Sequence, residues 1–139
     1  MVKHSRQKNN INKARALLRA GKVADAVSVL RKVLGKTPGN PEALELMAEL
    51  AFRQGDVANA ARLLQTVIVA QPDNDSALNK MAVACAMQSQ LPQAAGYLRR
   101  AININPDSFT SHYDLCKVTR EIGLLDESIE AGLNAVRIK

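Results

Sequence analysis

Aromatic side chains are scarce in this chain of 139 residues: Phe, Tyr and Trp together make up 3% of it, and Trp is absent. Apolar residues still account for 47%, so the core has to be built from Ala, Leu, Val and Ile. A core of that kind suits close-packed helices better than a sheet, in which β-branched and aromatic residues are favoured. The composition therefore predicts an all-α protein.

Long apolar runs are also missing. No stretch approaches the ~18 consecutive apolar residues that indicate a membrane-spanning helix. The basic segment 1–10 is not followed by the apolar core of a secretory signal. We therefore expect a cytoplasmic protein without a membrane span.

Signatures of catalysis and of cofactor binding do not occur either. The chain has no Gly-rich phosphate loop, no H-E-x-x-H helix and no G-x-S-x-G nucleophile motif. Cys85 and Cys116 are not part of a Cys/His cluster that could supply the four ligands of a zinc site. We expect two buried thiols, and a disulfide between neighbouring helices stays open. The sequence thus predicts no enzymatic activity for this chain alone, no metal and no cofactor.

What the sequence does contain is a period of 34 residues, which separates Pro38, Pro72 and Pro106. The windows that align behind these prolines are 7–40, 41–74, 75–108 and 109–139, the last of them truncated. A fixed period in this range is typical of solenoids, in which each repeat contacts only its neighbours.

The second window predicts the form of one repeat. Asn40 can cap a helix that has Pro41 at its first position. Gly55 lets the chain leave that helix in a left-handed conformation, and a second helix runs from Val57 towards Pro72. Each repeat is therefore predicted to be an antiparallel helix-turn-helix hairpin. Small residues recur where the two helices should cross: Ala14, Ala48, Ala82 and Cys116 at repeat position 8, and Ala26, Ala60, Ala94 and Ser128 at position 20.

These positions resemble the tetratricopeptide repeat family, which has small residues at positions 8 and 20 and Pro at position 32. The resemblance covers residues 7–139, and residues 1–9 are left as a loose basic lead. It implies an all-α, right-handed superhelix (solenoid) of about four antiparallel helix-turn-helix repeats. The chain departs from the family pattern because Leu, Ala, Val and Thr stand where the family has aromatic residues.

In the family, the first helix of each repeat lines a concave groove. The resemblance places these residues of this chain on it: Arg15, Arg19, Glu42, Glu45, Glu49, Phe52, Arg53, Asn79, Lys80, Val83, Met87, Tyr113, Asp114, Lys117 and Arg120. Ile11, Leu18 and Leu46 fall at groove positions as well. Because aromatic residues are enriched at interfaces, we expect Phe52 and Tyr113 to anchor a ligand. For any single charged residue, an ordinary solvated face is the competing interpretation.

The resemblance implies a protein–protein interaction scaffold or adaptor that holds a peptide or a partner helix in this groove. Two groove chemistries known in the family do not fit. At most two charges of the carboxylate clamp are present. The Asn ladder of O-linked N-acetylglucosamine transferases is absent, since its positions hold Asn12, Leu46, Lys80 and Asp114. The alternative hypothesis is the partner- or substrate-positioning module of a larger bacterial transferase, of the sulfotransferase or glycosyltransferase type.

Charge is distributed unevenly along the chain. Residues 1–36 hold ten Lys and Arg residues and one acidic residue, whereas residues 37–139 hold nine basic and twelve acidic residues. Such asymmetry can mark contact with nucleic acid or a membrane surface. The basic residues are not interleaved with aromatic rings for base stacking, so we expect a protein partner rather than nucleic acid.

The last repeat carries an unusual apolar residue. Leu133 stands where the three earlier repeats have Arg31, Gln65 and Arg99, and it continues an apolar series with Ile129. No polar capping helix follows, although terminal repeats usually need one for solubility. We therefore expect either a longer protein or a partner at this end, including self-association through the C-terminal helix.

Overall fold

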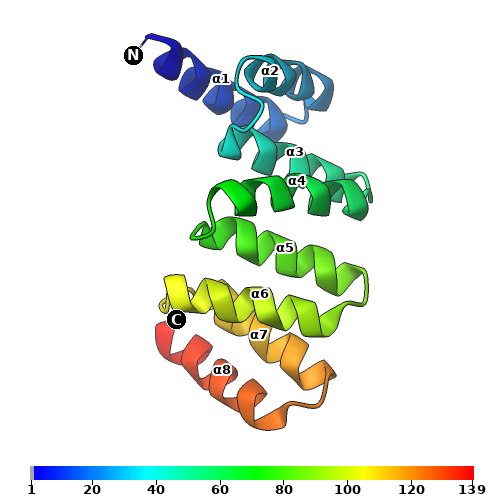
Figure 1. Cartoon of the computed structure of the whole chain (residues 1–139), viewed down its shortest axis with the longest axis vertical. Coiled ribbons are helices and arrows are strands. Elements are labelled where there is room, and N and C mark those ends of the chain that lie inside the picture. Colours follow the sequence, from blue (N-terminus) through cyan, green and yellow to red (C-terminus); the bar gives the residue numbers. More distant parts are fainter. Residues whose placement is uncertain (1) are drawn as a thin grey trace. The chain divides into compact units, whose positions relative to one another are not determined.

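The computed structural model describes residues 2–139, with side chains from Ser5 onward. The described residues form eight α-helices and no strand (Figure 1). The helices are α1 (Val2–Arg19), α2 (Val23–Lys36), α3 (Pro41–Arg53), α4 (Val57–Ala70), α5 (Asp75–Met87), α6 (Leu91–Ile104), α7 (Phe109–Glu121) and α8 (Leu125–Ile138). They come in consecutive pairs joined by short turns, so the predicted all-α helix-turn-helix class is confirmed.

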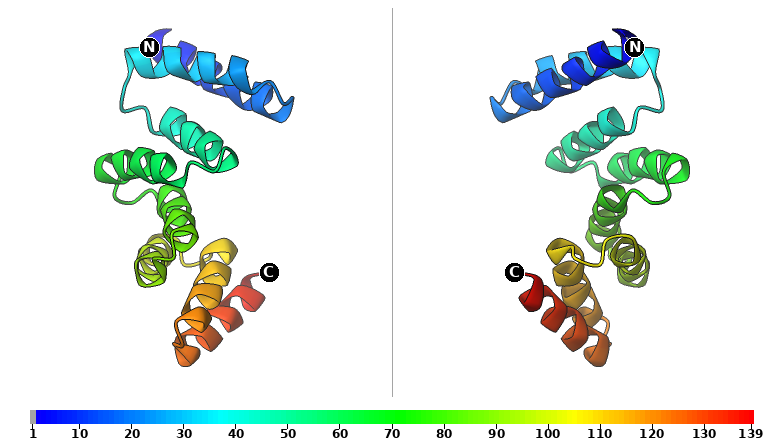
Figure 2. Two further views of the ribbon diagram at one scale, coloured as in Figure 1. Left: turned by 90° about the vertical axis from the view of Figure 1, so that its right-hand side faces the viewer. Right: turned by 90° about the vertical axis from the view of Figure 1, so that its left-hand side faces the viewer.

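Two compact units make up the chain: unit 1 ends at Val67 and unit 2 begins at Ile68, within α4. In unit 1, α1 packs on α2, and both helices contact α3. In unit 2, α5 packs on α6 and α7 packs on α8, while α7 also contacts α6 and α5. Figure 2 shows the α7–α8 hairpin, in orange and red, from two further sides.

The first helices of three repeats begin at capping side chains. The side-chain oxygens of Asn40, Asn74 and Ser108 each accept a hydrogen bond from the backbone N–H three residues further on, at 3.1, 3.0 and 3.2 Å. Each cap satisfies one of the N–H groups that a helix start leaves without a partner. The caps recur every 34 residues because the sequence does, and this fixes where α3, α5 and α7 begin.

Helix α1 is longer than the sequence indicated. It begins at Val2, so residues 2–9 belong to a helix and not to the loose lead that we predicted. The half-buried Gln7 donates a side-chain hydrogen bond to the hydroxyl of Thr37, which lies just after α2. This contact holds the early part of α1 against the end of its partner helix. The side chain of His4 lies outside the described residues.

The core consists of small and branched aliphatic residues, as predicted. Ala26, Ala60 and Ala94 are completely buried, and so are the leucines four residues further along the same helices, Leu30, Leu64 and Leu98. In α8, Ser128 takes the place of the alanine and is 6% exposed. Its hydroxyl donates to the backbone oxygen of Cys116 on α7, at 2.9 Å, so the polar atom is satisfied where α7 and α8 cross.

Cys85, Cys116 and His112 lie in unit 2, and their surroundings indicate structural rather than reactive side chains. Cys85 and Cys116 are both free thiols, so the disulfide that the sequence left open does not form. Burial raises the pKa of the Cys85 thiol, which disfavours the reactive thiolate. His112 is 5% exposed, and its Nε2 lies 2.7 Å from the backbone oxygen of Pro106. That contact fixes the ring inside the fold.

One turn carries backbone strain. The turns after α1, α3 and α7 place Gly21, Gly55 and Gly123 at φ values of 77°, 77° and 83°. The turn after α5 has Ser89 at this repeat position, with φ at 61°. Side chains bearing a Cβ adopt this left-handed region at a steric cost, whereas glycine does not.

Ser89→Gly is therefore expected to stabilise the protein by about 0.5–1 kcal/mol. The matched control is Gly123→Ser in the same unit, which should destabilise by a similar amount. Apart from Gly123 and its two neighbours in the chain, no atom lies within 4 Å of a Cβ built there, so only the backbone conformation is tested. Urea titrations measure both changes. Equal midpoints and slopes for wild type and Ser89→Gly would show that the turn is unstrained.

Candidate functional site

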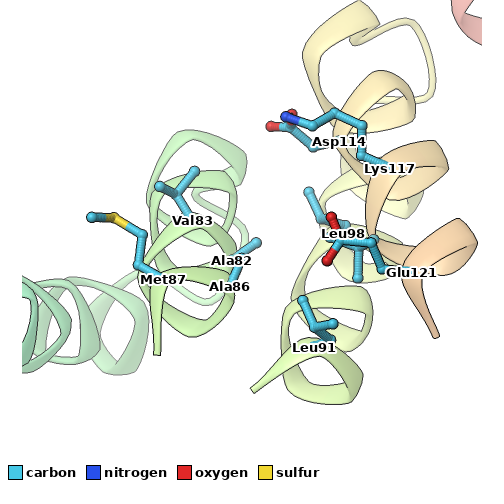
Figure 3. A pocket seen from close by; sticks show the side chains of 10 residues that line it. Ala82, Val83, Ala86, Met87, Leu91, Leu98, Asp114, Lys117 and Glu121 are labelled. Atoms are coloured by element: carbon cyan, nitrogen blue, oxygen red, sulfur yellow. The ribbon is translucent and has the colours of Figure 1, made fainter. Parts of the chain in front are cut away.

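A cavity of about 310 Å³ opens in unit 2 between α5 and α7 (Figure 3). We call it the α5–α7 cavity. Its apolar lining consists of Ala82, Val83, Ala86 and Met87 of α5, Leu91 and Leu98 of α6, and Val118 of α7. Its charged lining consists of Asp114, Lys117 and Glu121, all of α7. Of the residues predicted to face a groove, the structure thus brings Val83, Met87, Asp114 and Lys117 together.

Small residues on α5 create the space. Ala82 and Ala86 face the cavity from α5 in Figure 3, where larger side chains would fill it. Leu98 of α6 is fully buried and closes the apolar side. At the mouth, Val83 is 42% exposed and Met87 is 56% exposed. Methionine is flexible and polarisable, so it adapts to partners of different shape.

The charged rim comes from one helix. The carboxylate of Asp114 lies 4.0 Å from the ammonium of Lys117, and their charged ends lie close together in Figure 3. Burial raises the pKa of Asp114, and the nearby Lys117 partly offsets that shift. Glu121 is exposed on the same helix. An apolar pocket with a few charged groups at its edge is the usual make-up of a binding site.

An aromatic pair lies on the same helix. Tyr113 is 49% exposed and stacks on Phe109, with ring centroids 5.7 Å apart and planes inclined by 17°. The ammonium of Lys117 lies 5.4 Å from the Tyr113 ring, and that of Lys139 lies 4.9 Å from the Phe109 ring. Cation–π attraction at these distances helps to hold both rings in place. Tyr113 is therefore a fixed, accessible aromatic surface.

In unit 1 the predicted residues form a different arrangement. The guanidinium of Arg15 on α1 pairs with the carboxylate of Glu42 on α3 at 3.0 Å. Both side chains are exposed, so this pair adds little to stability. Glu45, Glu49 and Phe52 are half-buried, while Arg19 and Arg53 are exposed. Unlike Tyr113, Phe52 offers only part of its ring to a partner.

Some predicted groove positions belong to the core instead. Ile11, Leu18 and Leu46 are 3%, 8% and 6% exposed and lie within the buried cluster of unit 1. They were predicted to face the groove, and that prediction is wrong because α1 and α3 contact each other through apolar side chains.

In unit 2 one predicted groove residue connects two first helices. Asn79 is half-buried, and its side-chain oxygen accepts a hydrogen bond from the buried Ser111 at 2.8 Å, which links α5 to α7. Lys80 on α5 is half-buried, and Arg120 on α7 is exposed.

Reasoning from sequence missed Phe109 and Lys139. Phe109 lies four residues before Tyr113, a spacing at which helical side chains meet, so this partner could have been found. Lys139 follows α8, and nothing in its sequence position indicates contact with α7.

A second cleft, of about 780 Å³, lies in unit 1 between α1 and α2. Arg6, Lys32 and Lys36 line it, and its described lining includes no aromatic ring. Among residues 2–139, no group of three or more His, Cys, Asp or Glu side chains could hold a metal ion. Within the same range, no helix has both the length and the apolarity to cross a membrane.

A bidentate ion pair links α6 and α8 in unit 2. Arg99 of α6 donates from Nε and Nη2 to the two carboxylate oxygens of Glu127 on α8, at 2.6 and 2.8 Å. Hydrogen bonding by Arg99 lowers the pKa of Glu127. Asp114 and Glu127 are thus two carboxyl groups of one unit whose pKa values move in opposite directions.

These features define a helical-repeat protein of stacked two-helix units. The tetratricopeptide repeat profile matches residues 17–85, and the chain belongs to the tetratricopeptide repeat family. Among curated protein sequences none matches significantly.

Solved structures share the fold. A crystal structure of MamA is 25% identical, with a TM-score of 0.82, and the alignment covers 91% of this chain and 74% of that one. MamA from Desulfovibrio magneticus RS-1 is 20% identical with a TM-score of 0.76, covering 95% and 73%. A Thermobaculum terrenum O-GlcNAc transferase mutant is 24% identical with a TM-score of 0.78, covering 86% of this chain but 23% of that one. The solenoid class predicted from the sequence is confirmed.

The two shifted carboxyl groups predict opposite dependences of stability on pH. The folded state holds the Asp114 proton more tightly than the unfolded chain does, so this group's contribution to stability falls as pH rises above about 3.9. The contribution of Glu127 is present above about pH 4.3 and is lost as pH falls through its lowered folded pKa.

Urea titrations from about pH 3 to about pH 7 test both signs. Relative to wild type, Asp114→Asn should gain stability as pH rises. Glu127→Gln should lose stability over the same range and approach wild type in acid. If the three curves run parallel, neither carboxyl group has a shifted pKa.

Proposed function

We propose that the chain is a protein-interaction scaffold or adaptor, and that unit 2 binds a peptide or partner helix between α5 and α7. The observation that carries this proposal is the position of Val83, Met87 and Tyr113. All three are exposed side chains on first helices, and none is needed to fill the core. Val83 and Met87 line the α5–α7 cavity, and the Tyr113 ring contacts Lys117, which also lines it. The tetratricopeptide repeat fold supports an interaction module. No enzymatic activity is proposed.

The cavity suits an apolar anchor from the partner. Its apolar walls are alanine, leucine, valine and methionine side chains, and a partner side chain inserted there would displace water from apolar surface. The Tyr113 ring is contacted by Lys117, which lines the cavity, and its orientation is already held by Phe109 and Lys117. Ordering the ring on binding therefore costs little. Fixed aromatic groups next to apolar pockets are frequent binding hot spots.

The charges set which partner is accepted. Lys117 and Arg120 favour acidic groups on the partner, and Asp114 and Glu121 favour basic ones. Charges at a rim act mainly on specificity and on the association rate. In unit 1, the exposed Arg19 and Arg53 and the paired Arg15 and Glu42 are proposed to contribute in the same way.

Peptide selection tests this proposal. A library of displayed random peptides is selected against the chain, and the affinity of the recovered peptides is measured by fluorescence anisotropy. Met87→Ala together with Tyr113→Ala should weaken binding by about 2 kcal/mol, or about 30-fold, because both anchors are lost. Circular dichroism should show unchanged helix content.

The control is Ile104→Ala, which truncates an exposed apolar residue (41%) at the end of α6. It should leave peptide affinity unchanged. Selected peptides that bind the double variant as tightly as wild type would place the binding surface elsewhere on the chain.

The alternative hypothesis is that the chain positions a substrate or partner for a transferase. The likeness to the O-GlcNAc transferase supports it only at the level of fold, because identity is 24% and the chain spans 23% of that protein. A reading frame that continues beyond Lys139 into a transferase domain would favour this alternative, and a stop codon would favour the adaptor. A cytoplasmic location and the lack of a nucleic-acid partner stay predictions.

A second copy of the chain is a further proposed partner, bound through α8. Ile129 and Leu133 are 61% and 66% exposed on this helix, an uncommon exposure for aliphatic residues so close together. Ile129→Glu with Leu133→Glu should abolish self-association, measured as the loss of a concentration-dependent mass in sedimentation equilibrium. Val69→Glu, at an exposed apolar position on α4 (72%), is the control and should not change the mass. A wild-type mass equal to the monomer at high concentration would contradict this proposal.

A further inference from the structure

Helix α8 presents an exposed aliphatic stripe. Leu125, Ile129, Leu133 and Val136 are 61%, 61%, 66% and 76% exposed, and their spacing puts them on one face of the helix. The opposite face, with Ser128, Ala131 and Ala135, is buried in unit 2. Along one edge of the stripe run three exposed charged residues: Asp126 and Glu130 in the first half of the helix, and Arg137 near its end.

The stripe includes a residue, Leu133, whose equivalent on α6 is not apolar. On α6, the residues one repeat earlier than Leu125, Ile129 and Val136 are Leu91, Ala95 and Ile102, which are half-buried or buried where α7 packs on α6. The residue one repeat earlier than Leu133 is Arg99. It stays exposed and pairs with Glu127 on α8. A following repeat placed on α8 in the same way would therefore leave Leu133 partly exposed, because the Arg99 side chain is 46% exposed even where α8 reaches it.

We infer that the stripe is covered by the stripe of a second copy, with the two α8 helices antiparallel. This inference rests on the proposed self-association and specifies its geometry. In an antiparallel pair related by a two-fold axis, residues at equal distances on either side of the centre of α8 face each other. If the two-fold axis passes midway between Ile129 and Leu133, Ile129 of one copy lies opposite Leu133 of the other. The aliphatic residues of the two stripes then meet along the whole helix.

Charge distinguishes this orientation from the parallel one. A two-fold axis across antiparallel helices keeps each charged edge beside the same edge of the partner. Asp126 of one copy then faces Arg137 of the other, twice, while the two Glu130 side chains approach each other once, near the axis. In a parallel two-fold pair the charged edges lie on opposite sides of the interface, so neither Asp126 nor Arg137 faces an oppositely charged residue of this edge. Opposite charges facing each other across helices favour association, and like charges oppose it. No salt bridge among the described residues engages Asp126, Glu130 or Arg137 within the chain, so they are available for the partner.

Such an interface is isologous, because the same patch serves both copies, and it closes at two chains. It is also small. Two four-turn helices bury less than the roughly 1,600 Å² of a standard stable interface, so the dimer should be weak and form in the micromolar range. The account thus specifies a weak closed dimer rather than a filament or a larger ring.

Charge reversal tests the orientation. The acidic-edge variant is Asp126→Lys with Glu130→Lys, and the basic-edge variant is Arg137→Glu. Alone, each places like charges opposite one another and should dimerise at least about tenfold more weakly than wild type. Mixed in equal amounts, the two variants should form a heterodimer. At one end of this heterodimer, the lysine introduced at position 126 of the acidic-edge variant faces the glutamate introduced at position 137 of the basic-edge variant. At the other end, the unchanged Arg137 of the first chain faces the unchanged Asp126 of the second.

Sedimentation velocity over a concentration series provides the readout, with circular dichroism to show that each variant is folded. The control is Asp73→Lys, a charge reversal at an exposed position in the turn between α4 and α5 of unit 2, which should dimerise like wild type. Weakened single variants and a restored mixture are the expected result.

Other outcomes overturn the inference in different ways. If wild type is a dimer but both charge variants dimerise normally, the antiparallel pairing is wrong while self-association through α8 stands. If wild type forms larger assemblies with rising concentration, the closed two-fold arrangement is wrong. A wild-type monomer up to about millimolar concentration, well above the micromolar range expected for a weak interface, rejects self-association and its geometry together.

Discussion

Close approach of paired helices at small residues is the constraint on which the rest of this structure depends. Ala14, Ala26, Ala48, Ala60 and Ala94 have no exposed surface. At these crossings a larger side chain would force the helices apart, since protein interiors are packed to crystal-like density. Leucines on the same helices then fill the space beside the crossing. The repeat of 34 residues is the spacing that brings small residues back to each crossing.

The same packing determines which surfaces stay available. Two helices cannot bury all of their apolar area, so each hairpin uses its neighbours. In unit 2, α7 covers α6 and contacts α5. Most of the exposed large apolar side chains of this unit lie in two places: around the α5–α7 cavity, and along α8. These two surfaces differ in character, because the first is concave and mixed with charge while the second is a plain aliphatic stripe with charges at one edge.

The parts of this structure that depend on local sequence could be predicted, and those that depend on contacts between distant residues could not. The cap at Asn40 and the turn at Gly55 follow from neighbouring residues. The hydrogen bond between Asn79 and Ser111 and the contact of Lys139 with Phe109 join residues far apart in the chain, and no pattern in the sequence encodes them. The family pattern assigned Ile11 to the groove, but the same side of α1 also packs against the next repeat, so Ile11 is buried in the core.

The measurement that tests the central claim most directly is NMR mapping of a selected peptide on the isotopically labelled chain. The account predicts that the largest chemical-shift changes fall on α5 and α7, with the methyl groups of Val83 and Met87 and the ring of Tyr113 among them. Changes confined to the second helices, α6 and α8, with none around the α5–α7 cavity, would contradict it.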